Sequence, residues 1–318
     1  MLKPWVRRLH LWVALGFALP LIAVIGSGAF LALEPAAKAL TPPGTVTLER
    51  LQAILDAAGP EGERGALFIR GYDGTATLGG RNGPGGAKVF DLATAQVTEP
   101  GPLASAFRTT RRFHETLLLD LGWVVEWSTI ALLLLLPLGL LLGWPRLRHT
   151  VLGWHRLAGW ALLPLLVGSP LTGLFLAYGI SFATPTPRLP GTPPPLAETL
   201  RLVAERHDLN GLDWVRPAGG ARNVRVLDAS GTATVYRASA TGLEPLPRNW
   251  PRLLHEGNWA GVLGSLANLV AALAMLGLLG TGIYLWARRQ VMRRKARASR
   301  GAAPRPRQEP QVLASPTS

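Results

Sequence analysis

Cysteine is absent from the 318 residues, and this absence excludes several kinds of chemistry. The chain forms no disulfide, has no thiol nucleophile, holds no iron–sulfur cluster through thiolates and lacks the Cys-x-x-Cys-His attachment of c-type haem. Acidic residues are also scarce, with 19 Asp and Glu against 33 Lys and Arg. Any haem cofactor in this chain is therefore held by non-covalent contacts.

Charge is missing from long parts of the sequence as well. Four nearly uncharged apolar runs cover residues 11–33, 117–144, 157–180 and 257–287. Each exceeds the about 20 residues that a helix needs to cross a membrane. The first run follows two arginines, as in a signal peptide, but its 23 residues exceed the usual apolar core of about 7–15 residues. The sequence predicts a four-span helical membrane protein that retains its first span.

The excess positive charge lies beside these runs and on one side of them. Residues 1–10, 144–156 and 287–318 hold 15 Lys and Arg against one acid, Glu309, which accounts for the whole net charge of +14. The positive-inside rule makes that side cytoplasmic, so both termini are expected inside and the long polar segments outside. Membrane topology and contact with membrane lipid explain the basic residues, and no nucleic-acid partner is expected.

Four of the six histidines stand at the edges of the apolar runs. His10 and His155 are 145 residues apart, and His114 and His255 are 141 apart. Alternate crossing of the membrane places His10 and His155, the inner pair, at the cytoplasmic face and His114 and His255, the outer pair, at the external face. Ionisable groups at membrane depth are costly and usually functional. The repeated spacing predicts an internal duplication.

The predicted fold class is an α-helical membrane protein with four transmembrane helices and two small external α+β domains, built as an internal duplication. Helices are expected over 47–58 and 196–206, and strands over 66–70, 75–78, 87–91, 223–228 and 232–238. The predicted division is a cytoplasmic N-terminus (1–10), spans over 11–33, 114–144, 155–180 and 255–287, external domains over 34–113 and 181–254, a cytoplasmic loop (145–154) and a disordered basic tail (288–318).

The paired histidines have the arrangement that haem ligation requires. Low-spin haem b takes two neutral imidazoles from facing helices, so the inner and outer pairs are each candidates to hold one haem through its iron. His149 is an alternative to His155. A lone histidine at an interface more often only forms hydrogen bonds, but four at equivalent positions favour ligation. At opposite faces, the two sites are separated by over 20 residues, or about 30 Å along a helix.

Arginines near each pair are candidate partners for haem propionates, which are anionic and favour guanidinium groups. Topology alone is an equal explanation for those near the inner pair, whereas those near the outer pair depart from the positive-inside bias and favour a local role. The candidates are Arg7, Arg8 and Arg156 for the inner pair, and Arg111, Arg112 and Arg252 for the outer pair.

Acidic and small residues complete the candidate site. Glu115 and Glu256 each follow an outer histidine, and because neighbours on a helix do not share a face, they are expected to contact other elements. Glu126 is a candidate for a proton or cation contact, or lines a polar interface. Small residues in the spans permit close helix packing, which explains most of them, and also leave room for a flat macrocycle. They are Gly26, Ser27, Gly28, Gly168, Ser169, Gly173, Gly261, Gly264, Gly277, Gly280 and Gly282.

Several local motifs resemble one family. Val89-Phe-Asp-Leu-Ala-Thr-Ala-Gln-Val and Val235-Tyr-Arg-Ala-Ser-Ala-Thr-Gly-Leu resemble the closing strand and turn of PepSY domains. The early His10, the sequence Gly153-Trp-His155-Arg and the two His-Glu pairs resemble the PepSY-associated transmembrane helix family. The resemblance covers roughly residues 5–290. It implies an iron-regulated protein of the bacterial inner membrane with periplasmic PepSY-like domains.

The resemblance also implies a function, because this family includes siderophore-linked ferric reductases that carry b-type haem. The expected protein passes electrons through two haems to a ferric siderophore or another ferric chelate. Its electron donor is a quinol or a cytoplasmic reductase, since the chain has no flavin module of its own. Two alternatives stay open, namely a membrane-anchored PepSY module that binds peptides or regulates a protease without catalysis, and a small transporter.

Overall fold

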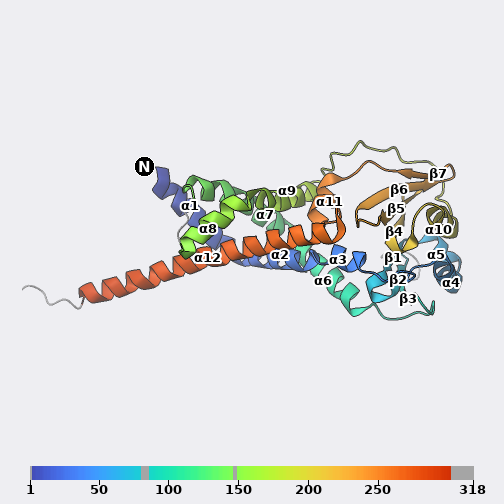
Figure 1. The fold of residues 1–318 in the computed structure, drawn as a ribbon, viewed down its shortest axis with the longest axis horizontal. Helices are drawn as coiled ribbons and strands as arrows, with labels where there is room; N and C mark the ends of the chain where they lie inside the picture. Colours follow the sequence, from blue (N-terminus) through green and yellow to red (C-terminus); the bar gives the residue numbers. More distant parts are fainter. Residues whose placement is uncertain (1, 80–85, 146–148, 302–318) are drawn as a thin grey trace, which may run out of the picture.

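The computed structural model describes residues 2–79, 86–145 and 149–301. Figure 1 shows an elongated molecule with a bundle of helices along most of its length and a β-sheet at one end. The N-terminus lies at the end away from the sheet, and so does the final part of α12. The molecule therefore has a sheet end and a terminal end.

Seven helices form the long bundle. They are α1 (Leu2–Gly16), α2 (Ala18–Leu31), α3 (Glu34–Ala39), α7 (Gly122–Leu141), α8 (Val151–Ala161), α9 (Leu163–Ala177) and α12 (Gly261–Gly301). Three helices, over Ala18–Ala39, Gly122–Leu141 and Gly261–Ala298, are long and apolar enough to cross a membrane. The pair α8 and α9, bent by 63°, adds a fourth if it is one span. The predicted apolar runs thus become three or four candidate spans.

Proline explains the breaks in the first and third runs. Pro20 and Pro164 lie just after the breaks, at the beginnings of α2 and α9. A proline lacks the backbone N–H, and its ring clashes with the carbonyl four residues earlier, so the preceding helix ends there. Helix α1 accordingly ends at Gly16 and α8 at Ala161. Each of the two runs is divided into two helices.

The outer histidines lie on short helices that precede the spans, which differs from the predicted continuous spans 114–144 and 255–287. His114 is near the end of α6 (Pro102–Thr116), and His255 is near the end of α11 (Trp250–Glu256). Left-handed residues end both helices, Leu117 at φ 52° and Gly257 at φ 73°. The break frees each histidine-bearing helix to pack against another span, α6 against α2 and α11 against α9.

The two external segments, predicted as two small units, share one antiparallel sheet with the order β3-β2-β1-β4-β5-β6-β7. The first segment gives three strands and the second gives four, and β1 pairs with β4 through Leu67↔Val215 and Phe68↔Trp214. The strands are β1 (Leu67–Arg70), β2 (Thr75–Leu78), β3 (Lys88–Asp91), β4 (Leu212–Pro217), β5 (Arg222–Leu227), β6 (Ala233–Ser239) and β7 (Gly242–Pro245). Each segment follows the order helix, then strands, so the segments have matching layouts.

One core lies beneath the whole sheet. It joins α4 (Leu48–Ala58) and α10 (Leu196–Ala204) to strands of both segments, and the short α5 (Pro60–Arg64), η1 (Gly71–Asp73) and η2 (Leu209–Gly211) connect them. Thr47 caps α4, since its side chain accepts a hydrogen bond from the Arg50 backbone N–H. Arg222 is 1% exposed and donates to the carbonyls of Pro194, Glu63 and Gly65. These bonds tie the second segment to the first.

Helix α12 has 41 residues and is about 60 Å long at 1.5 Å per residue. A bilayer core is about 30 Å thick, so the helix continues well beyond one span. Its last turns carry Arg288, Arg289, Arg293, Arg294, Lys295 and Arg297. The predicted disordered tail, 288–318, is therefore helical as far as Gly301, and residues 302–318 lie outside the described residues.

Candidate functional site

The outer histidines lie close together inside the helical bundle, against α2 and α9. The ring centroids of His114 and His255 are 6.1 Å apart, with the ring planes at 42°. They come from different halves of the chain, on α6 and α11. Two imidazoles that share one metal ion, each with a bond of about 2.0 Å, have their centroids about 6 Å apart. The outer pair therefore has the separation of two ligands on one metal ion.

His114 is held by α2. Its Nδ1 lies 3.0 Å from the Val24 carbonyl oxygen and 3.0 Å from Ser27 Oγ. A carbonyl only accepts, and the Ser27 hydroxyl donates to the carbonyls of Ala23 and Val24. Nδ1 must then carry the proton, and Nε2 keeps the lone pair that binds a metal.

His255 is held by α9 in the same way. Its Nδ1 lies 3.0 Å from the Ser169 carbonyl oxygen and 3.5 Å from Thr172 Oγ1. The Thr172 hydroxyl donates to the Gly168 carbonyl, so it also offers a lone pair to the ring. The Nδ1 proton is again fixed, and Nε2 is left as an acceptor. Metal-bound histidines usually donate their second N–H in this manner.

Glycine makes room for each outer ring. A Cβ added at Gly28 lies 3.2 Å from His114 Cε1, and one added at Gly173 lies 2.7 Å from His255 Cε1. The two glycines are 145 residues apart in the sequence, and Ser27 and Thr172 have the same spacing. The two halves therefore hold their outer histidine with the same three components, a carbonyl, a hydroxyl and a glycine.

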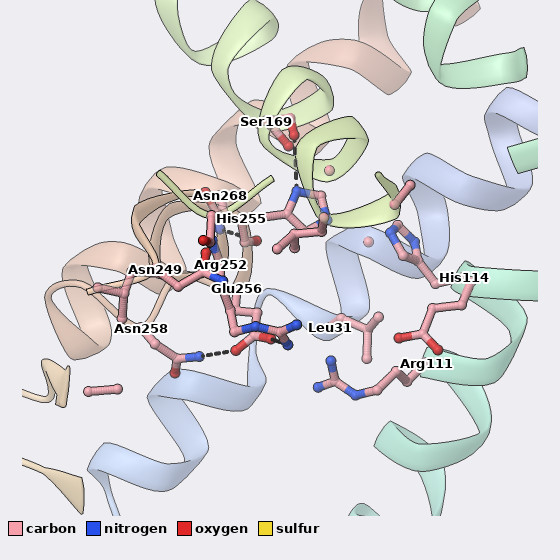
Figure 2. Close-up of a pocket in the computed structure, with 18 of the residues that line it drawn as sticks. Leu31, Arg111, His114, Ser169, Asn249, Arg252, His255, Glu256, Asn258 and Asn268 are labelled. Carbon is pink, nitrogen blue, oxygen red and sulfur yellow. Dashed lines mark hydrogen bonds and ion pairs between the residues drawn. The ribbon is translucent and has the colours of Figure 1, made fainter. Parts of the chain in front are cut away.

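A large cavity opens beside the outer pair. Its volume is about 1140 Å³, above the about 300–1,000 Å³ of common ligand pockets. Figure 2 shows His114 and His255 on different walls of this cavity, with the Arg111 side chain extending into the same space. Bundle residues such as Leu21 and Met275 line it, and so do charged residues of the sheet end. The cavity is apolar at one end and charged at the other.

A network of buried ion pairs forms the charged end. Arg111 of α6 binds Glu34, and Lys38 bridges Glu34 at 3.3 Å and Asp213 at 3.1 Å. Asp213 of β4 also lies 3.2 Å from Arg70 Nη1. These pairs connect the first span to the sheet.

The network continues to the helix that carries His255. Arg225 of β5 lies 3.5 Å from Asp213 and 2.9 Å from Glu256, and Glu256 also binds Arg252 at 2.9 Å. Burial alone raises the pKa of Glu256, but Arg225, Arg252, Arg111 and Lys38 together lower it to about 2. Burial likewise raises the pKa of Asp213, and Lys38, Arg225 and Arg70 outweigh it, so that pKa lies well below its ordinary value. Both acids are anionic near neutral pH.

The inner pair is arranged around glycines too. A Cβ added at Gly139 of α7 lies 3.5 Å from His10 Cε1, and one added at Gly282 of α12 lies 3.7 Å from His155 Cε1. No ring contact joins these two histidines among the described residues, unlike the outer pair. The inner pair is therefore the more widely separated one.

The predicted arginine and glutamate candidates divide into two groups. Arg111, Arg252, Glu115, Glu126 and Glu256 line the cavity. Arg112 is exposed on α6 and is not part of the cavity wall.

The candidates of the terminal end are placed differently. Arg7 and Arg8 are exposed on α1, and Arg156 is half-buried on α8. His149, the alternative to His155, is exposed, and its ring lies 6.3 Å from that of Trp154. The His155 ring points into the bundle, where its Nδ1 atom lies 2.8 Å from Thr281 Oγ1 of α12. Of His149 and His155, His155 is therefore the better placed partner for His10.

Five of the eight charges of the network were missed from the sequence. Glu34, Lys38 and Asp213 have no motif around them, and Arg70 and Arg225 read as ordinary strand arginines. The one local signal is the i, i+4 spacing of Glu34 and Lys38 at the end of an apolar run. Their common location depends on the packing of α3 against the sheet, which no local pattern gives.

Comparison with protein families agrees with this architecture. The model of the PepSY-associated TM region matches residues 7–289. The chain belongs to this family. The match covers all four histidines of the two pairs and every charged residue of the network. No curated protein matches the chain.

Proposed function

We propose that this PepSY-associated membrane protein carries electrons across the bacterial inner membrane through two b-type haems. The outer pair is proposed to hold one haem and the inner pair the other. The sheet end is proposed to be periplasmic, and both termini cytoplasmic. The observation that carries the proposal is the outer pair itself, with rings 6.1 Å apart and both Nδ1 protons already donated.

The fit of haem to the outer pair rests on three features. Nε2 of each ring is the free acceptor, Gly28 and Gly173 leave the rings room, and the adjoining cavity of about 1140 Å³ is large enough for a macrocycle. Bound there, haem supplies a one-electron redox couple. His114 and His255 hold the iron, and α2 and α9 orient their imidazoles.

The charge of the network supports an anionic occupant. Five cations (Lys38, Arg70, Arg111, Arg225 and Arg252) meet three anions (Glu34, Asp213 and Glu256), which leaves two positive charges unneutralised. Arg111 and Arg252 have the most exposed side chains of the five cations, 41% and 55%, so they are the two that are accessible to a further anion. Haem b carries two propionates, and Arg111 and Arg252 both line the cavity. Their guanidinium groups are the proposed partners of the carboxylates.

The packing of α6 and α11 shortens the path between the two sites. His114 contacts Val24, which is only 14 residues beyond His10, and His255 contacts Ser169, 14 residues beyond His155. Fourteen residues extend at most about 21 Å along a straight helix, against the about 30 Å expected from the span ends. The 63° bend between α8 and α9 shortens that distance further. The outer rings hang inward toward the middle of the bundle. Direct electron transfer between the sites becomes easier as a result.

The substrate side of the proposal is ferric iron in a siderophore or another chelate, reduced at the sheet end by one electron to ferrous iron. Basic residues at the terminal end support the orientation, because α12 carries seven of them after residue 287 and the N-terminus lies at the same end. A quinol or a cytoplasmic reductase is the proposed donor. No side chain needs to act as a nucleophile in such a reaction.

The test is the reduced-minus-oxidised visible spectrum of the purified protein from haem-replete cells. The proposal expects sharp α-bands of low-spin haem b and two haems per chain by pyridine haemochrome. His114→Ala and His10→Ala should each remove about half of the haem, and His207→Ala, in the sheet domain, should remove none. A wild-type protein without haem would overturn the proposal and direct attention to peptide binding by the sheet.

A second experiment tests direction. Proteoliposomes loaded with dithionite and washed should reduce ferric citrate outside the vesicles, and the rate should fall at least tenfold with His114→Ala. Reduction that persists unchanged without the outer histidine would contradict the assignment of the outer pair as the exit site.

A further inference from the structure

The four histidines differ in how their Nδ1 atoms are satisfied. Nδ1 of His114 and His255 reaches a carbonyl and a hydroxyl, and Nδ1 of His155 lies 2.8 Å from Thr281 Oγ1. Nδ1 of His10 is buried and has no hydrogen-bond partner. A backbone carbonyl approaches each inner ring, that of Leu135 at His10 and that of Leu278 at His155, so the Thr281 hydroxyl is the difference between them. One histidine of the inner pair is oriented, and the other is not.

The repeat shows which residue is missing. Gly139 contacts His10 and Gly282 contacts His155, and these glycines are 143 residues apart. Thr281 directly precedes Gly282, and Leu138 directly precedes Gly139, so Leu138 is the counterpart of Thr281 in the first half. Leu138 is buried in the bundle and offers no hydroxyl. A leucine thus occupies the place of the threonine that would satisfy His10.

The Thr281 hydroxyl is oriented to accept a hydrogen bond from His155. Its hydroxyl donates to the carbonyls of Gly277 at 2.7 Å and Leu278 at 3.1 Å, so its lone pairs face the ring. The His155 Nδ1 atom therefore donates, and its Nε2 atom is the free acceptor. For His10, no such contact selects between the two tautomers.

We propose that Thr281 is a positioning residue that fixes the tautomer of His155, and that Leu138 leaves His10 as the one unfixed ligand of the inner haem. This inference rests on the proposed function. Donation from Nδ1 makes an imidazole a stronger donor to iron, which favours the ferric state and lowers the reduction potential. Thr281 therefore lowers the reduction potential of the inner haem. Leu138 offers His10 no acceptor, so His10 does not lower that potential further.

The experiment is a spectroelectrochemical titration of the two-haem protein, fitted with two potentials. Thr281→Val removes the hydroxyl at constant shape and should move one potential in the positive direction and weaken haem retention about tenfold. Thr281→Ser should restore both values. Leu138→Thr should move the same potential in the negative direction, because it supplies the missing acceptor to His10.

Controls separate this effect from general disturbance of the bundle. Leu134→Thr changes the same helix at a 45% exposed position and should leave both potentials unchanged. Ser27→Ala should move only the other potential, that of the outer haem. The inference is overturned if Thr281→Val leaves both potentials in place, if it moves both equally, or if Leu138→Thr behaves like Leu134→Thr.

A haem-free readout distinguishes this inference from the proposed function. Nitrogen-15 shifts of labelled histidine in the haem-free protein should report a single Nδ1–H tautomer for His155 and a mixture for His10. Thr281→Val should convert His155 to a mixture. A wild-type protein that purifies without haem from haem-replete cells would defeat the proposed function. A mixture of tautomers at His155 in the wild-type protein would defeat the positioning role of Thr281, even if the protein binds haem.

Discussion

The outer and inner pairs use the same residue types but differ in their surroundings. The outer rings are 6.1 Å apart, each held at Nδ1, and all seven ion pairs of the described residues lie on their side of the molecule. The inner rings have one fixed member, and exposed arginines stand nearby. The difference indicates that the outer site is shaped by contacts between the two halves of the chain, whereas the inner site depends on helix packing alone.

Removal of an outer histidine should give the largest effect on this comparison. His255→Ala deletes one of two facing ligands, so we expect complete loss of the outer haem and retention of the inner one. The measurement is haem content per chain together with the redox titration. If both haems disappear while the protein stays folded by circular dichroism, the two sites are not independent.

Neutralising Asp213 should come next. Asp213→Asn leaves Lys38, Arg70 and Arg225 without their shared anion, and removal of one partner of a buried ion pair costs about 3–5 kcal/mol. We expect the sheet end to unfold at a lower temperature and the outer haem to be lost before the inner one. Thermal melts followed by haem absorbance test this order, and Asp56→Asn on the exposed face of α4 is the matched control.

Acid should break the same network in the native protein. Because the pKa of Glu256 is lowered to about 2 and that of Asp213 is lowered as well, folding gains stability from both anions at pH above their unfolded values near 4. This stabilisation is lost as the pH falls from about 4.5 toward 2. Denaturation followed between pH 7 and pH 3 should show the outer haem released first. Equal release of both haems would argue against the network as its support.

A glycine series should rank the four rings by their clearance. The Cβ of Gly173→Ala lies 2.7 Å from its histidine, that of Gly28→Ala 3.2 Å, that of Gly139→Ala 3.5 Å and that of Gly282→Ala 3.7 Å. Haem retention should fall in that order of severity, with Gly282→Ala close to the wild type.

Gly277→Ala is the control for the series, because nothing lies within 4 Å of its added Cβ. It should be neutral or slightly stabilising, since alanine favours helix over glycine by about 1 kcal/mol. A loss of haem as large as that of Gly173→Ala would mean that the bundle is sensitive to any change in its glycines.

The smallest effect is expected for His149→Ala. His149 is exposed, and its ring lies 6.3 Å from that of Trp154. Haem content and both potentials should match the wild type. A missing inner haem in this variant would make His149, in place of His155, the partner of His10.

The sequence predicts the features that recur in both halves of the chain better than the contacts between distant segments. The histidine positions and the apolar runs are read directly from the sequence, and the local motifs carry the resemblance to the PepSY-associated family, which is confirmed. The ends of α6 and α11 do not follow, because Leu117 adopts a positive φ that its residue type rarely takes. The sharing of one sheet was also not predicted, since the β1–β4 contact joins residues far apart in the chain.

The candidate site shows the same division. Arg111 and Arg252 were found because they stand next to histidines, whereas Lys38 and Asp213 meet 175 positions apart. Gly28 and Gly173 read as packing residues, and their closeness to the rings depends on the depth to which α6 and α11 descend along the spans. Contacts set by the relative placement of helices need coordinates, because periodicity describes one helix at a time.

The central β1–β4 pairing has a consequence for synthesis of the protein. Leu67 emerges from the ribosome 148 residues before its partner Val215, and two further apolar runs are made in between. Until then, β1 is an unpaired edge, which is a template for wrong pairing. The first segment therefore completes its part of the sheet only after the second and third apolar runs have been made, so assembly of the sheet is a late step in synthesis of the chain.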